Sequence, residues 1–134
     1  MVFLIFNKTV GKSTVATNIA ICLSHGFNQK VGLVDADIYG PSIHKLMKLS
    51  GKPEVLPSKK LVPKSNYGIK TMSMGFLIPE DSPTIWRGPM VMGAVENLIK
   101  DVEWGDLDIM VIDLPPGTGD AQLTVNLKYF LDSE

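Results

Sequence analysis

The sequence contains a single cysteine, Cys22, among its 134 residues. One cysteine excludes an internal disulfide framework and any metal site built from paired cysteines of this chain, and it suits a reducing compartment. No apolar run approaches the roughly 20 residues of a membrane-spanning helix. With a net charge of −1, the chain also lacks the strong field that draws a protein to nucleic acid or to an acidic membrane. We therefore expect neither nucleic acid nor membrane among its partners.

We recognise no targeting signal in the first residues of the sequence. Residues 1–7 are apolar, but they have neither a basic region nor a small-residue cleavage site, and they are not an Arg-rich amphipathic segment. The length suffices for one domain with a core of its own and is short for a complete α/β domain. We expect residues 1–134 to form a single, partial domain.

Apolar runs rich in β-branched residues predict the strands, and they lie at residues 2–6, 31–34, 67–76 and 109–112. In the third of these, Met72 and Met74 share one face, which favours core packing. Residues 50–66 are rich in Pro, Lys and Ser and predict a long connection, in which a small hairpin is one option.

Apolar residues at helical spacing predict the helices between the strands. In the first helix, Val15, Ile19, Cys22 and Leu23 fall on one face and Gly26 is the expected end, so Cys22 is interpreted as a core residue. A short helix is expected after Pro41. A third is expected from Pro89, with an apolar stripe formed by Val91, Val95, Leu98 and Val102. Strands that alternate with helices indicate the α/β class, a parallel sheet with helices on both faces.

The first candidate site is Val10-Gly11-Lys12-Ser13-Thr14, between a strand and a helix. A helix N-terminus offers free N–H groups and a partial positive charge to an anion. In a phosphate loop the lysine reaches the terminal phosphates and the next hydroxyl binds Mg²⁺. The full signature has a glycine five residues before Gly11, where this chain has Phe6.

Carboxylates at two strand ends form the second candidate site. Asp35 and Asp37 follow one strand and Asp113 ends another. Because ligands of open α/β sheets bind outside the carboxyl ends of the strands, these side chains can hold Mg²⁺ and orient an attacking water. A helix-capping or turn role is the alternative for Asp35 and Asp37. Behind Asp113, Gly117-Thr118-Gly119-Asp120 suits a loop that senses a γ-phosphate.

Several strings together resemble the Mrp/NUBPL-like branch of the deviant-Walker P-loop ATPases, relatives of MinD and ParA: VGKST, DADIYGPS, MSMGF, WRGPM and DLPPGTGD. The resemblance covers residues 10–126. It implies an ATP-dependent iron-sulfur cluster carrier or assembly factor that works as a homodimer on iron-sulfur client apoproteins. The compartment would be the cytoplasm or, alternatively, the mitochondrial matrix. A role for Trp86-Arg87-Gly88 does not follow from the residues, since loop packing and a contact with partner or nucleotide fit them equally.

By resemblance, Val10, Gly11, Lys12, Ser13 and Thr14 bind ATP. Lys12 and Asp37 are the catalytic residues, the latter by positioning the hydrolytic water, and Ser13, Asp35 and Asp113 form the Mg²⁺ site. The family carries a 4Fe-4S cluster on a Cys-x-x-Cys pair, which this sequence lacks.

The phosphate loop departs from the family pattern GKGGVGKST. Phe6, Lys8 and Thr9 stand at glycine positions, and Asn7 replaces the lysine that reaches across the dimer. A Cβ at a positive φ costs on the order of 1 kcal/mol per residue, so nucleotide affinity and ATPase activity should be weak. We also expect the family pattern to end at Asn126 and the sheet to be incomplete at its C-terminal side. An inactive fragment that at most binds partners is therefore one alternative, and a ParA/MinD-like partitioning ATPase is another.

Overall fold

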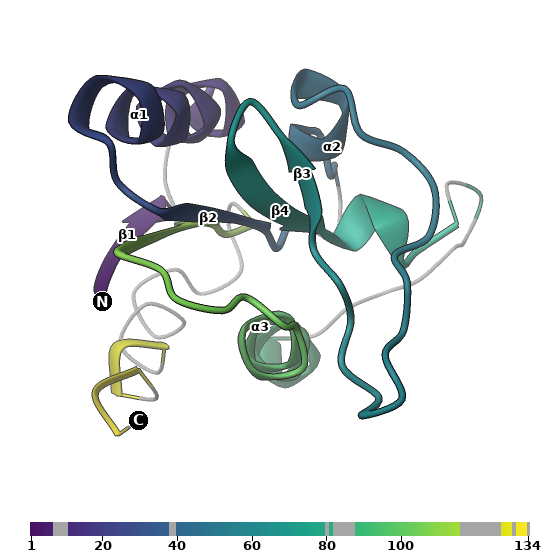
Figure 1. Cartoon of the computed structure of the whole chain (residues 1–134). Coiled ribbons are helices and arrows are strands. Elements are labelled where there is room, and N and C mark those ends of the chain that lie inside the picture. The colour runs from purple at the N-terminus through teal and green to yellow at the C-terminus, as the bar shows by residue number, and fades with distance from the viewer. Residues whose placement is uncertain are drawn as a thin grey trace.

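The computed structural model describes residues 1–6, 11–37, 40–79, 81, 88–115, 127–129 and 131–133. Within them lies one sheet with the strand order β1-β5-β2-β4-β3 (Figure 1). Its strands are β1 (Val2–Phe6), β2 (Val31–Asp35), β3 (Lys64–Asn66), β4 (Ile69–Ser73) and β5 (Ile109–Asp113). The first four in spatial order are parallel, and β3 pairs antiparallel with β4. The expected α/β class is confirmed, with a mixed rather than a purely parallel sheet.

The antiparallel edge arises from a two-residue turn. Tyr67 and Gly68 both have positive φ, at 52° and 73°, which is the backbone that a tight hairpin with right-twisted strands requires. The strand expected at residues 67–76 is therefore shorter, because its first two residues form this turn. Its last three form the 3₁₀ helix η1 (Met74–Phe76). In the expected connection at 50–66, an antiparallel bridge between Val55 and Leu61 agrees with the small hairpin that the sequence left open, and the last residues form β3.

Helices cover both faces of the sheet (Figure 1). On one face lie α1 (Lys12–Phe27) and α2 (Ile43–Leu46), which contact each other and the strands. On the other lies α3 (Gly88–Lys100), whose Val91, Val95 and Leu98 are buried, as the stripe predicted. Met72 and Met74 are buried in the same core cluster. No helix of the described residues is long and apolar enough to cross a membrane.

The buried face of α1 differs from the expected one. Ala16 and Ala20 are fully buried, whereas Val15 is 48% exposed and Cys22 is exposed. The prediction that Cys22 is a core residue is wrong. Ala16 and Ala20 belong to the core cluster on this face of the sheet, and of the expected residues Leu23 packs against that cluster. The helix also continues past Gly26, and Asn28, in the left-handed region at φ 51°, forms its C-cap.

Candidate functional site

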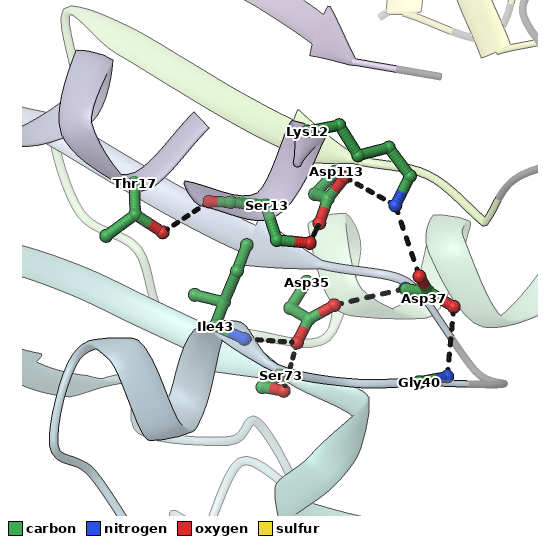
Figure 2. A network of polar contacts seen from close by, with 9 residues as sticks. All are labelled: Lys12, Ser13, Thr17, Asp35, Asp37, Gly40, Ile43, Ser73 and Asp113. Atoms are coloured by element: carbon green, nitrogen blue, oxygen red, sulfur yellow. Dashed lines mark hydrogen bonds and ion pairs between the residues drawn. The ribbon is translucent and has the colours of Figure 1, made fainter. Parts of the chain in front are cut away.

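Four strands end in one row at the carboxyl edge of the sheet. The register pairs Phe6 of β1 with Asp113 of β5, Asp113 with Asp35 of β2, and Asp35 with Ser73 of β4. Strand pairing alone therefore brings two carboxylates and a hydroxyl side by side. The N-terminus of α1 starts at the same edge, so its first residues face this row (Figure 2).

Lys12 lies between two carboxylates. Its Nζ is 3.1 Å from Asp37 Oδ2 and 3.0 Å from Asp113 Oδ1. The lysine is 6% exposed, Asp37 is 7% exposed and Asp113 is fully buried, so these charges are little screened by solvent. The structure thus brings together three of the side chains that the sequence suggested as one site (Figure 2).

The first turn of α1 adds a hydroxyl to this cluster. Ser13 donates a hydrogen bond from Oγ to Asp113 Oδ2, and Thr17 fixes the turn by donating to the carbonyl of Ser13 at 2.8 Å. Before the helix, Gly11 has φ 82°, a left-handed backbone that favours glycine. Thr14 is exposed. Val10, Trp86, Arg87 and residues 117–120 lie outside the described residues, and of Gly88 the structure describes only the backbone at the start of α3.

Asp35 is buried beside this cluster and accepts hydrogen bonds from three segments. The donors are Ser73 Oγ at 2.9 Å, the backbone N–H of Ile43 at 3.1 Å and that of Asp37 at 3.2 Å. The first residue of α2 is thereby capped by Asp35 rather than by Ser42, whose side chain makes no capping bond. These contacts favour the capping alternative for Asp35, and its role as a Mg²⁺ ligand stays a prediction.

Burial affects the pKa of Lys12, of Asp113 and of Asp35. It lowers the pKa of Lys12, but the hydrogen bonds and charges of Asp113 and Asp37 outweigh it, so the pKa of Lys12 is raised. Burial raises the pKa of Asp113 despite the opposing hydrogen bonds from Ser13 and Lys12. Burial raises the pKa of Asp35 to about 7, against the hydrogen bond from Ser73. Lys12 is thus a well-held cation that offsets the charge of its carboxylate neighbours.

The donor set fits Mg²⁺ bound together with phosphates. Asp113 Oδ1 is buried and meets the Lys12 ammonium at 3.0 Å, and the Ser13 hydroxyl donates to the other oxygen. No group of three potential His, Cys, Asp or Glu metal ligands occurs in the described part of the chain. Mg²⁺ commonly keeps several waters and takes only one or two protein carboxylates plus phosphate oxygens. The arrangement is suited to an ion that arrives with a nucleotide.

The spacing of the sequence did not single out Ser73 as a member of this polar network. Its partner Asp35 is 38 positions away, and the string Met-Ser-Met indicates only a strand with alternating faces. Ser73 could have been found from its position, because Asp35 and Ser73 each end one of two neighbouring parallel strands.

A strand that leads into a lysine- and serine-bearing helix N-terminus, with an aspartate at the end of the adjacent parallel strand, defines the class of P-loop NTPases. The chain belongs to the NUBPL iron-transfer P-loop NTPase family of the ParA group, whose sequence model matches residues 8–132. This match passes beyond Asn126, so the expectation that the family pattern ends there is wrong. Leu127, which lies within the longer match, is fully buried and belongs to the same core cluster as the apolar stripe of α3.

The relatives of this chain include proteins of iron-sulfur metabolism. It is 53% identical to the Arabidopsis thaliana iron-sulfur protein required for NADH dehydrogenase, mitochondrial, over 89% of this chain and 39% of that protein. It is 55% identical to the mouse iron-sulfur cluster transfer protein NUBPL, over 87% of this chain and 37% of that protein. The chain thus spans less than two fifths of the length of these curated relatives.

A solved structure shares the fold. The nucleotide-binding protein from Archaeoglobus fulgidus in complex with ADP superimposes with a TM-score of 0.71 at 38% identity, covering 94% of this chain and 48% of that one.

Proposed function

We propose that this chain is the nucleotide-binding part of an ATP-dependent iron-sulfur cluster carrier. The observation that carries the proposal is the position of Lys12 between Asp37 and Asp113, with Ser13 on Asp113, at the carboxyl edge of the sheet. Membership of the iron-transfer family and the two iron-sulfur relatives support an iron-sulfur cluster as the cargo.

The residues would divide the work as follows. The N–H groups of α1's first turn, from Gly11 to Thr14, and the Val10 segment before it bind the phosphates. Lys12 exchanges its carboxylate partners for the terminal phosphates, and Asp37, released from that ion pair, accepts a hydrogen bond from the attacking water. Ser13 and Asp113 would hold Mg²⁺, which would supply positive charge against the phosphates. Asp35 shapes the loop that carries Asp37.

The iron-sulfur cluster is cargo in this proposal. The sequence has one cysteine, so we assign the nucleotide step, and not the 4Fe-4S ligands, to these residues. In the whole protein, a homodimer would hand the cluster to client apoproteins in the cytoplasm or the mitochondrial matrix.

An inactive chain with partner binding at most is the second candidate. Phe6, Asn7, Lys8 and Thr9 at the phosphate loop favour it. A partitioning ATPase is not favoured, because the matching family and relatives are those of iron transfer.

Binding of a fluorescent, non-hydrolysable ATP analogue with Mg²⁺ separates these candidates. The triple variant N7K/K8G/T9G restores the loop and keeps Phe6, whose half-buried ring packs on the core; adding Phe6→Gly completes the pattern. We expect weak binding by the natural chain and at least tenfold tighter binding by a restored variant. Lys12→Ala in the restored variant should abolish the gain. No binding by any restored variant contradicts the proposed function.

A further inference from the structure

The string Met72–Phe76 has no assigned role in nucleotide binding, although it lies next to the site. Met72 and Met74 pack in the core on the α3 face of the sheet. Ser73 lies between them in sequence, is fully buried, and contacts Asp35 near the start of α2 (Figure 2). A buried hydroxyl at a strand end is costly unless both its proton and its oxygen find partners.

Ser73 has such partners on two sides. Its Oγ donates to Asp35 Oδ2 at 2.9 Å and accepts from the backbone N–H of Gly75 at 3.0 Å. The hydroxyl therefore joins the end of β4 and the start of η1 to the carboxylate at the end of β2.

Gly75 lets η1 approach α2 closely. A Cβ at this position would lie 2.5 Å from ring atoms of His44, which a real side chain cannot do without displacing the ring. That ring also packs edge-on against Phe76, with centroids 5.9 Å apart. Ser73 and Gly75 thus both serve the contact of β4 and η1 with the end of β2 and with α2.

This contact leads to Asp37. The Asp35 carboxylate, held by Ser73, accepts the backbone N–H of Asp37, and Asp37 Oδ1 accepts the N–H of Gly40 at 3.2 Å. The remaining oxygen of Asp37 lies on Lys12. A chain of hydrogen bonds thus runs from Ser73 through the Asp35 carboxylate to the backbone of Asp37, whose carboxylate is held in turn by Gly40 and Lys12.

We propose that Ser73 is a positioning residue, which acts through Asp35 to hold the Asp37 carboxylate where it meets Lys12 and the attacking water. The assignment rests on the proposed function for its catalytic consequence, but its structural core, the coupling of Ser73 to Asp37, does not depend on ATP. Lys12 and Ser13 belong to α1 and make none of the Ser73 contacts. Loss of the hydroxyl should consequently affect turnover more than nucleotide binding.

Thr71 offers a matched control for Ser73. It precedes Ser73 by two positions on the same face of β4 and is fully buried, and its Oγ1 has no hydrogen-bond partner among the described residues. Thr71→Val removes a buried hydroxyl without breaking a hydrogen bond, whereas Ser73→Ala breaks the bonds with Asp35 and Gly75 and a longer one, of 3.5 Å, with His44 Nδ1. Ser73→Thr keeps the hydroxyl and serves as the rescuing variant.

The first measurement is steady-state ATP hydrolysis by the full chain with the loop restored. Ser73→Ala should lower kcat at least tenfold with less than a threefold change in KM, since a displacement of about 1 Å at a reacting group can cost on the order of a hundredfold. Thr71→Val should stay within twofold of the parent, and Ser73→Thr should recover most of kcat. Equal effects of Ser73→Ala and Thr71→Val, or a loss confined to KM, overturn the proposal.

The second measurement needs no catalysis. Unfolding of the natural chain is compared for Ser73→Ala, Asp37→Asn and the double variant, because residues in one network couple while independent sites add. Each substitution raises the unfolding equilibrium constant by some factor. We expect the factor for the double variant to be smaller than the product of the two single factors by about threefold or more. The cycle with Thr71→Val in place of Ser73→Ala should be additive. Additivity in both cycles overturns the assignment of Ser73, whereas coupling without any ATP hydrolysis keeps it and contradicts only the proposed ATPase.

Discussion

Lys12 is the residue on which the charge balance of the site depends. Lys12→Met keeps much of the side-chain length but leaves Asp37 and Asp113 near each other without their shared cation. Breaking a buried ion pair typically costs about 3–5 kcal/mol. We therefore expect a loss of that order in the free energy of unfolding, measured by urea denaturation.

The surface pair of Lys60 and Glu103 provides the control for this prediction. Its atoms are 3.7 Å apart and both side chains are about half exposed, at 47% and 51%. Exposed pairs contribute roughly 0–1 kcal/mol, so Lys60→Met should lower the free energy of unfolding by no more than about 1 kcal/mol. Similar losses in the two variants would show that Lys12 is not a buried counterion.

Asp35 gives the chain a dependence of stability on pH. Its pKa is about 7 in the folded protein, whereas an unperturbed aspartate has a pKa of 3.8. Between these values the folded state binds more protons than the unfolded chain, so the stabilisation is present at low pH and is lost as the pH rises through about 7. The slope from this one group reaches at most about 1.4 kcal/mol per pH unit.

The free energy of unfolding is measured between about pH 4.5 and about pH 7.5, at intervals of roughly half a pH unit. Asp35→Asn should flatten the decline with rising pH, although Asp113, whose pKa burial also raises, leaves a slope of the same sign. An unchanged slope in Asp35→Asn contradicts this account.

At the scale of elements, β2 is the most confined part of the sheet. All five of its residues are buried, and a Cβ at Gly32 would lie 2.6 Å from Leu107 Cδ1 and 3.2 Å from the Trp104 ring. Gly32→Ala therefore overpacks the core, which typically costs about 1–3 kcal/mol. Thermal unfolding should show a clear drop in Tm.

Gly93 provides the opposite case for the same substitution. It lies within α3, and a Cβ there meets nothing within 4 Å. Alanine in a helix is favoured over glycine by about 0.5–1 kcal/mol, so Gly93→Ala should raise Tm. A loss of stability in both variants would mean that the glycine-to-alanine change, and not the space around it, decides the outcome.

The elements also separate what the sequence can predict from what it cannot. The ends of β2 and β5 were predictable because an apolar run closed by aspartate is a local pattern. The buried face of α1 was not, because the larger apolar side chains of Val15 and Ile19 favour their own face over that of Ala16 and Ala20. Which face of α1 is buried depends on how the helix packs on the sheet, and local sequence does not determine this packing.

At the scale of the whole molecule, the site could be predicted where it follows from sheet topology. Parallel strands bring their carboxyl ends to one edge, so the meeting of Lys12 with Asp37 and Asp113 was expected from three local patterns. The partners of Asp35 were not, because Ser73 and Ile43 reach it through strand order and the path of a loop. The antiparallel β3 was missed for a similar reason, since Lys64–Asn66 has no apolar alternation of its own.

Nucleotide binding should stabilise the whole fold, because the residues proposed to bind it come from α1, β5 and the loop after β2. A ligand at about 100 times its Kd adds roughly 2.7 kcal/mol to the free energy of unfolding. For a chain of this size that corresponds to an increase in Tm of roughly 10 °C. The measurement is thermal unfolding of the loop-restored variant across a series of Mg²⁺-nucleotide concentrations.

The dependence on concentration decides this last prediction. Specific binding to the folded state makes the Tm rise with the logarithm of free nucleotide once the site is saturated, whereas a non-specific salt effect follows ionic strength and is reproduced by Mg²⁺ with sulfate. Lys12→Met should abolish the nucleotide-dependent part, and Thr71→Val should keep it in full. An equal rise of Tm in the Lys12 variant would place the nucleotide away from the cluster of Lys12, Asp37 and Asp113, and the proposed site would then be wrong even though the fold belongs to this family.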